Sequence, residues 1–233
     1  MRVAILSDIH ANLPALTKAL DLTKAKGADE IWCLGDIVGY GAEPNECVQL
    51  IADECKRCVL GNHDQAVVFP DVPKFLPWEG KVAAEWTSSV LTEQNRGFLR
   101  SLPLIDSTDT STLVHASPSS PSSWIYISSL ARAHEQFPHF TTLLCVIGHT
   151  HVPSICGDDL KTFSFKPGRR FLINVGSVGQ PRDGNPHLSF GILDTKAWSY
   201  QNIRAEYDVA AAASAILRKG LPRPLADRLY AGT

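Results

Sequence analysis

The chain has 233 residues, a length that suits one domain with a sizeable hydrophobic core. Hydrophobic residues make up 44% and charged residues 20%, and the formal net charge of −2 argues against a broad basic surface for duplex nucleic acid. No apolar run approaches membrane-spanning length, and a cleaved signal peptide would remove the candidate ligands at positions 8 and 10. The six cysteines lie mostly in apolar segments without disulfide spacing, so we expect a reduced, cytoplasmic protein with no membrane partner.

The first quarter of the chain predicts a β-α-β-α-β unit. Short apolar runs indicate buried strands at Val3–Leu6, Ile31–Leu34 and Cys58–Leu60. Between them, helices are expected from Asn12, which can cap the first, to Gly27, and from Pro44 to about Cys55. Right-handed crossovers between such strands give a parallel sheet.

The segment from Gln65 to Leu102 does not continue the alternation of strands and helices. A loop containing Pro70, Pro73 and Pro77 precedes a helix predicted from Glu79 to Leu91, and a shorter helix ends near Leu102. Because residues 65–102 carry no cluster of ligand-type side chains, they either pack on the sheet or form a partial lid over a site. We favour packing.

The next part of the chain predicts two more strands, Thr112–Val114 and Leu143–Ile147. Between them, residues 117–129 are rich in serine and proline and read as a loop that follows His115 directly. Trp124 and Tyr126 lie in this loop, where they either line a site or anchor the loop structurally.

After His151 the pattern changes to short segments. The expected strands are Ser154–Cys156, Lys161–Phe165, Arg170–Asn174, His187–Leu193 and Ala197–Arg204. We expect them to be largely antiparallel and to form a second sheet packed on the first. A helix from Val209 to Arg218 follows, and residues 220–233 are expected to be a surface helix whose charges are solvated. One domain, 1–233, accounts for the whole chain.

Polar side chains follow five of the predicted strands at the point where each strand ends. They are Asp8 with His10, Asp36, Asn62 with His63, His115, and His149 with His151. Because the carboxyl ends of parallel strands meet at one edge of a sheet, we expect these side chains to converge there. Oxygen and imidazole ligands on rigid elements are what a metal cluster requires. The other histidines, His134, His139 and His187, are expected to be structural or solvated.

At these residues the chain resembles the calcineurin-like metallophosphoesterases. The matching blocks are Asp8-x-His10, Gly35-Asp36-(x)4-Gly41, Gly61-Asn62-His63-Asp64, His115 and Gly148-His149-Thr150-His151. Within that superfamily the chain is most similar to a small bacterial-type subgroup that includes phosphodiesterases, at residues 8–13, 35–41, 174–184 and 220–222. The resemblance covers nearly the whole chain. It implies an α/β fold: a four-layer αββα sandwich of two mixed β-sheets flanked by helices.

The resemblance also implies a role for each matched residue. One divalent metal ion would be bound by Asp8, His10 and His151, a second by Asn62, His115 and His149, and Asp36 would bridge the two. A hydroxide bridging the metals would attack phosphorus, and His63 would protonate the leaving alkoxide as general acid. The mixed ligand set suits Mn, Fe, Zn or Ni, of which we favour Mn.

The loop that carries Asp36 departs from that of the related Ser/Thr protein phosphatases, which reads Gly-Asp-x-x-Asp-Arg-Gly. Here its last three residues are Gly39-Tyr40-Gly41. The arginine that grips phosphate in that family and the carboxylate that orients its catalytic histidine are therefore both missing. We take Asp64 as the candidate that orients His63. We hypothesise that Arg182 supplies the phosphate contact, with Tyr40 as a second substrate-binding residue.

These residues predict a dinuclear-metal phosphoesterase that hydrolyses a small phosphate ester, either a phosphodiester or a nucleotide polyphosphate. The alternatives are a phosphomonoesterase or protein phosphatase, and, in a different class, a non-enzymatic scaffold on the same fold. All seven ligand positions and His63 are present, so we rank the scaffold below the enzyme. The expected partner is a small phosphate ester or nucleotide.

Overall fold

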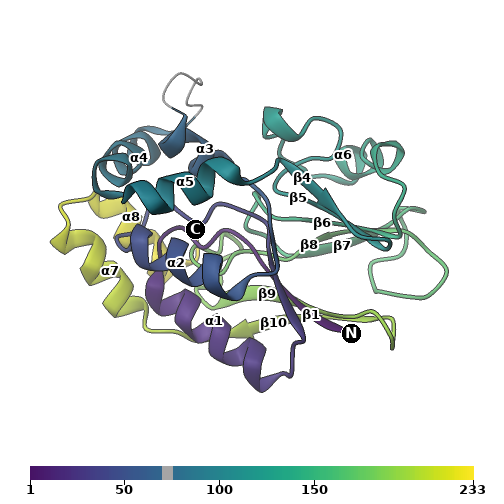
Figure 1. The fold of residues 1–233 in the computed structure, drawn as a ribbon. Helices are drawn as coiled ribbons and strands as arrows, with labels where there is room; N and C mark the ends of the chain where they lie inside the picture. The colour runs from purple at the N-terminus through teal and green to yellow at the C-terminus, as the bar shows by residue number, and fades with distance from the viewer. Residues whose placement is uncertain (70–75) are drawn as a thin grey trace.

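Figure 1 shows a computed structural model of the chain, which describes residues 1–69 and 76–233. Pro70 and Pro73 of the predicted loop lie outside the described residues. The strands are β1 (Arg2–Leu6), β2 (Glu30–Cys33), β3 (Arg57–Cys58), β4 (Ile105–Ser107), β5 (Ser111–Val114), β6 (Leu144–Ile147), β7 (Ser154–Gly157), β8 (Phe171–Asn174), β9 (Leu188–Asp194) and β10 (Ser199–Ala205). The helices are α1 (Leu13–Ala25), α2 (Pro44–Glu54), α3 (Asn62–Val68), α4 (Trp78–Val90), α5 (Glu93–Ser101), α6 (Leu130–His134), α7 (Val209–Arg218) and α8 (Arg223–Ala231).

The strands form two five-stranded sheets, and both sheets are mixed. The first has the order β10-β9-β1-β2-β3, with β1, β2 and β3 parallel and β9 and β10 antiparallel. The second has the order β4-β5-β6-β8-β7, with β5, β6 and β8 parallel between the antiparallel strands β4 and β7. Each sheet therefore has parallel strands whose carboxyl ends share one edge.

Alternation of side chains along the strands builds the layers of the fold. Val3 and Ile5 of β1 point into an apolar layer between the sheets, where they meet Val146 of β6. Ala4 of β1 faces the opposite way, toward α1, α2, α3 and α5 on the outer face of the first sheet. Cys145 of β6 faces a smaller cluster that includes a residue of α6, on the outer face of the second sheet. The four-layer αββα sandwich of two mixed sheets is thus confirmed (Figure 1).

The predicted β-α-β-α-β unit is confirmed, but the predicted division into sheets is wrong. Strands β9 and β10 pair with β1 and complete the first sheet, and the second sheet has a parallel centre. The expected strand Lys161–Phe165 does not form, because the carboxylate of Asp159 accepts hydrogen bonds from the backbone amides of Lys161 and Thr162 and folds this segment into a turn.

The helices after the third strand are close to those expected. The two helices predicted between Glu79 and Leu102 are confirmed as α4 and α5, and α3, which begins at Asn62, was not foreseen. The tail forms a helix, α8, but not one that is solvated all round. One face buries Leu225 and Leu229 in a cluster that also contains Tyr40 and residues of α4 and α7. Among the helices of the described ranges, none combines the length and the apolarity needed to cross a membrane.

The apolar layer between the sheets should contribute measurably to the stability of the fold. Leu144 of β6 is fully buried in it, and we expect Leu144→Ala to lower the free energy of unfolding by about 2–5 kcal/mol, because lost apolar contacts leave a cavity. The matched control is Leu217→Ala on α7, whose side chain is 50% exposed. It should change the free energy by no more than about 0.5 kcal/mol. Urea unfolding followed by circular dichroism measures both, and equal losses would contradict the assigned layer.

Candidate metal centre

The ligand-type residues meet where the parallel strands of both sheets end. Asp8 follows β1, Asp36 follows β2, and His115 and His149 follow β5 and β6 of the other sheet. Asn62 opens α3 just after β3. We expected these side chains to converge at one edge of a single sheet, and this is wrong in detail. The two sheets pack so that the carboxyl ends of their parallel strands lie together, and both sheets contribute ligand-type residues.

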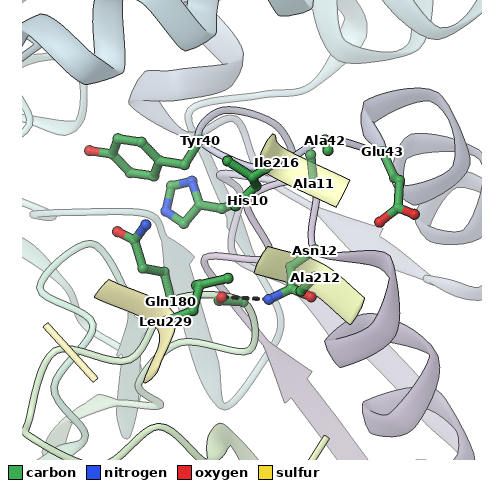
Figure 2. Close-up of a pocket in the computed structure, with 12 residues that line it drawn as sticks. His10, Ala11, Asn12, Tyr40, Ala42, Glu43, Gln180, Ala212, Ile216 and Leu229 are labelled. Carbon is green, nitrogen blue, oxygen red and sulfur yellow. Dashed lines mark hydrogen bonds between the residues drawn. The ribbon is translucent and has the colours of Figure 1, made fainter. Parts of the chain in front are cut away.

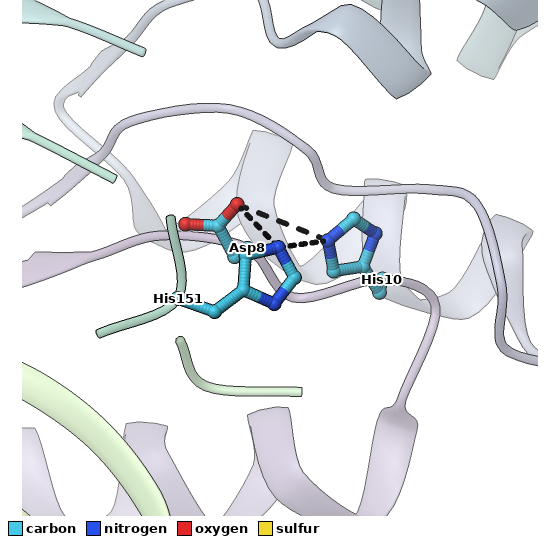
Figure 3. Close-up of side chains that lie close together, drawn as sticks. All are labelled: Asp8, His10 and His151. Carbon is cyan, nitrogen blue, oxygen red and sulfur yellow. Dashed lines mark hydrogen bonds and ion pairs between the residues drawn. The ribbon is translucent and has the colours of Figure 1, made fainter. Parts of the chain in front are cut away.

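Asp8, His10 and His151 form the first group of side chains, and all three are buried (Figure 3). The Nε2 atoms of His10 and His151 lie 3.1 Å apart. Oδ1 of Asp8 lies 3.2 Å from Nε2 of His151 and 3.8 Å from Nε2 of His10. Three potential ligand atoms, two from the loop after β1 and one from the loop after β6, thus face one small volume.

Asp36, His115 and His149 form a second group beside the first, and Asn62 adjoins it. Nε2 of His115 lies 3.3 Å from Oδ2 of Asp36 and 3.2 Å from Oδ1 of Asn62. The same Oδ2 of Asp36 lies 3.7 Å from Nε2 of His10 in the first group. Asp36 therefore stands between the two groups.

Each imidazole is oriented by a hydrogen bond to a main-chain carbonyl. Nδ1 of His10, His115 and His151 bonds to the carbonyls of Val38 (3.2 Å), Leu34 (2.8 Å) and Gln180 (2.5 Å). His149 is turned the other way, with Nε2 bonded to the carbonyl of Trp124 at 2.9 Å. A carbonyl can only accept, so each of these ring nitrogens carries the proton. In a neutral ring the other nitrogen then presents a lone pair, as metal-binding histidines do.

Two features of the cluster fit bound cations. Oδ1 of Asp8 is buried and accepts no hydrogen bond within the described chain, although Oδ2 accepts one from the amide of His149. The Nε2 lone pairs of His10 and His151 face each other at 3.1 Å, which is unfavourable unless a positive charge lies between them. Carboxylate, imidazole and amide donors together suit divalent transition metals.

The titration behaviour of the cluster separates His115 from His10 and His149. Burial and His151 hold the pKa of His10 well below its usual value, and burial and His115 lower the pKa of His149 to about 3. Burial alone would also lower the pKa of His115, but Asp36 and Asp8 raise it to about 10. The carboxylates of Asp8 and Asp36 thus favour a positive charge on His115, whereas burial favours the neutral form of His10 and His149.

Asp64 does not orient His63, contrary to the sequence expectation. Its Oδ1 accepts hydrogen bonds from the amides of Ile37 and Val38 at 2.9 and 3.0 Å, and its Oδ2 accepts one from the amide of Gly61 at 3.1 Å. Nδ1 of His63 is buried without a hydrogen-bond partner in the described residues. Asp64 therefore fixes the loop that follows Asp36, and its carboxylate is fully used there.

His63 lies beside the two groups and packs against Tyr40. The two rings are 4.3 Å apart at their centroids, and the backbone amide of His63 donates to Oδ1 of Asp36 at 2.8 Å. Gly39 makes this packing feasible, because its backbone has φ of +92° and a Cβ there would approach Nδ1 of His63 to 2.5 Å. Burial and Arg182, opposed by Asp36, lower the pKa of His63 to about 4.

A cavity of 430 Å³ opens over the cluster. Its lining includes Asn62, His63 and His149 of the cluster, with Tyr40, Arg182 and Arg228 and the aromatic side chains Trp124 and Tyr126. Arg182 donates to Oε1 of Gln180 at 3.0 Å and to the hydroxyl of Tyr40 at 3.4 Å. Of the two readings of Trp124 and Tyr126, the structure favours the lining of the site. The predicted substrate-binding pair, Tyr40 and Arg182, lies at this cavity.

The C-terminal helices pack directly behind the first group of ligands. Figure 2 shows the ring of His10 between Tyr40 and Gln180, with Ile216 of α7 and Leu229 of α8 nearby. The cavity that these residues line has a volume of about 10 Å³, which is room for one water molecule at most. The turn that carries His10 is therefore held by helices that begin two hundred residues later.

Three residues of the site were missed from the sequence. Asn174 donates to the carbonyl of Gly148 at 2.6 Å and so steadies the loop that carries His149 and His151. It follows a strand, as Asn62 does, and that signal was available. Gln180 lies in the matching block 174–184 but was given no role there, whereas Arg228 comes from a helix with no comparable signal, so only the tertiary structure brings it to the site.

Comparison with known proteins agrees with this geometry. Residues 1–197 match the calcineurin-like phosphoesterase superfamily domain. A metallophosphoesterase from Sphaerobacter thermophilus superimposes with a TM-score of 0.89 at 38% identity, covering 100% of this chain and 99% of its own. An uncharacterized protein of Methanocaldococcus jannaschii is 37% identical, over 99% of this chain and 98% of its own length. The phosphodiesterase YfcE of Escherichia coli K12 is 25% identical, over 85% of this chain and 90% of its own length.

A fold of two packed sheets with a buried Asp/His cluster at their common end defines a metal-dependent hydrolase site. The chain belongs to the calcineurin-like phosphoesterase superfamily, and it is a metal-dependent phosphoric ester hydrolase.

Gly148 tests how tightly the loop of His149 must approach Asp8. A Cβ at this position would fall on Oγ of Ser7 and on Oδ2 of Asp8, both of which are buried. We expect Gly148→Ala to lower bound metal and phosphoesterase activity at least about tenfold, because displaced ligands bind metal poorly. Gly97→Ala, on α5 with no heavy atom within 4 Å of its Cβ, is the control and should leave both unchanged. Metal content by mass spectrometry and hydrolysis rates decide, and a fully loaded, active Gly148→Ala protein would contradict the assigned contact.

Proposed function

We propose that this protein hydrolyses a small phosphodiester or a nucleotide polyphosphate at a dinuclear metal centre. The observation that carries the proposal is the buried, unsatisfied Oδ1 of Asp8 facing the Nε2 atoms of His10 and His151. In this proposal Asp8, His10 and His151 would hold one cation and Asn62, His115 and His149 the other, with Asp36 standing between the two groups. Bound there, the cations would supply Lewis-acid charge and would make water more nucleophilic at neutral pH.

Manganese is our first candidate for both positions, with iron, zinc and nickel as alternatives. The donor set mixes hard carboxylate and amide oxygens with imidazole nitrogens, which all four metals accept. No thiolate lies among the grouped ligand atoms of the described residues, which makes the set less selective for zinc.

His63 is the proposed general acid. It borders both the cluster and the cavity, where a leaving oxygen would lie. Burial lowers the pKa of this ring, and a phosphate anion in the cavity would raise it again by stabilising the imidazolium, so that the ring takes up a proton from solvent as substrate binds. The ring can then deliver its proton as negative charge develops on the leaving group.

Arg182 is the proposed contact for the non-bridging phosphate oxygens. Its guanidinium is held by Gln180 and by the Tyr40 hydroxyl, and both bonds leave N–H groups free to donate into the cavity. This arrangement supplies from the loop after β8 a charge that protein phosphatases supply from the Asp36 loop. In that loop Tyr40 stands where the protein phosphatases have their phosphate-binding arginine, and this difference argues against a protein phosphatase. Leu76 and Pro77 also line the cavity, so part of segment 65–102 borders the substrate.

The assignment of Asp36 predicts that its charge, not its shape, is essential. With added Mn²⁺, the wild type should hydrolyse bis(p-nitrophenyl) phosphate, and Asp36→Asn should lower the rate on the order of 100-fold or more. Asp21→Asn, at an exposed position on α1, is the control and should behave as wild type. Equal rates for Asp36→Asn and wild type would remove Asp36 from the centre. A wild type inactive with every divalent metal would favour the scaffold.

The assignment of Arg182 predicts a defect in substrate binding. Arg182→Ala should raise KM about tenfold or more, because a charge-assisted phosphate contact is lost, and Arg182→Lys should recover part of the loss. The control is Arg218→Ala on the exposed end of α7. Steady-state kinetics measure the change, and an Arg182→Ala enzyme with unaltered KM and kcat would rule this role out.

A further inference from the structure

Two guanidinium groups from different parts of the chain flank Tyr40. That of Arg182 lies 5.7 Å from the centroid of the Tyr40 ring, and that of Arg228, on α8, lies 5.8 Å from it. Both arginines also line the cavity over the metal ligands. The tyrosine thus holds two positive charges at one wall of the cavity.

Neither charge is neutralised by a carboxylate of the described chain, although arginines nearby are. Arg204 pairs with Asp183, the residue next to Arg182, and Arg223 pairs with Asp227, the residue next to Arg228. The aspartate next to Arg182 and the aspartate next to Arg228 thus each form an ion pair with a different arginine. An electropositive wall inside a cavity attracts an anion carrying more than one negative charge.

Arg228 is partly buried and lies on a helix that is packed against the rest of the fold. Its neighbours Leu225 and Leu229 are buried in the cluster that contains Tyr40 and Ala83 of α4. The guanidinium therefore reaches the cavity from a packed helix, so the backbone that carries it is already ordered before a ligand binds.

Another part of the cavity lining is aromatic. Tyr126 packs on His149 with ring centroids 4.0 Å apart, and the indole N–H of Trp124 donates to Gln65 at 3.0 Å. Tyr126 is 53% exposed, so much of its surface is open to a ligand. Such side chains suit a planar base, which stacks on aromatic faces.

We propose that Arg228 is a specificity-determining residue that binds a second phosphate group of the substrate, and that it selects nucleoside di- and polyphosphates over esters with one phosphorus. The inference rests on the proposed function, since Arg182 and the metal ligands would hold the reacting phosphorus. Trp124 and Tyr126 then receive the base.

The kinetic test compares substrates with one phosphorus and with several. With Mn²⁺, Arg228→Ala should lower kcat/KM for ATP about tenfold more than for bis(p-nitrophenyl) phosphate, mainly through KM, and Arg228→Lys should recover part of the difference. Arg223→Ala, on the same helix and exposed, is the matched control and should match wild type on both substrates. Equal losses on both substrates would overturn the inference. Inorganic triphosphate distinguishes the source: a rate equal to that with ATP would show that the base is not recognised.

A binding test on the metal-free protein separates this inference from the proposed function. By titration calorimetry, wild type should bind ADP at least about tenfold more tightly than AMP, and Arg228→Ala should abolish the difference. Equal affinities for ADP and AMP would overturn the role of Arg228, even in an active phosphodiesterase. A preference for ADP that depends on Arg228 would support it, even if the wild type fails to hydrolyse any ester and the proposed function falls.

Discussion

The site depends on loops that are hydrogen-bonded to one another through their main chains. The amide of Asp8 donates to the carbonyl of Gly35, that of His10 to Asp36, and that of Gly179 to Asp8. Strand-like pairing therefore continues past the ends of the strands, and the carbonyls that orient His10, His115 and His151 belong to these same loops. Displacing one loop would move ligands of both groups, so the ligand geometry is a property of the packed sheets rather than of single side chains.

This geometry carries an internal energetic conflict. Five of the ligand-type residues, Asp8, His10, Asp36, His149 and His151, have positive φ, a backbone conformation that L-residues rarely adopt. Their buried oxygens and lone pairs also face one another without enough protons to pair them. The surrounding hydrogen bonds over-determine the arrangement, and bound cations would relieve its repulsion. Metal binding in such a site contributes to the stability of the folded state as well as to chemistry.

Most of this site could be predicted from the sequence, because its signals are local. Asp8, Asp36 and His149 each end an apolar strand, and the β-α-β-α-β pattern fixes the order of three such ends. The partner of a strand is not a local property. Strand β9 has a pattern that fits either sheet, and only packing assigns it to β1. Asp64 was misread for a related reason: its place beside His63 in the chain does not reveal that its oxygens turn to the Asp36 loop.

The cationic side chains at the cavity, like the strand partners, are placed by tertiary packing rather than by local sequence signals. In the loop Gly39-Tyr40-Gly41 a tyrosine stands where the related protein phosphatases have arginine, and its ring contacts guanidinium groups from the loop after β8 and from α8. A charge carried on the Asp36 loop would be bound to the geometry of the metals. A charge carried on α8 comes from a separate element, which packs against Tyr40 of that loop through the apolar cluster of Leu225 and Leu229. The part of the substrate remote from the reacting phosphorus can therefore be recognised by an element that carries none of the candidate metal ligands.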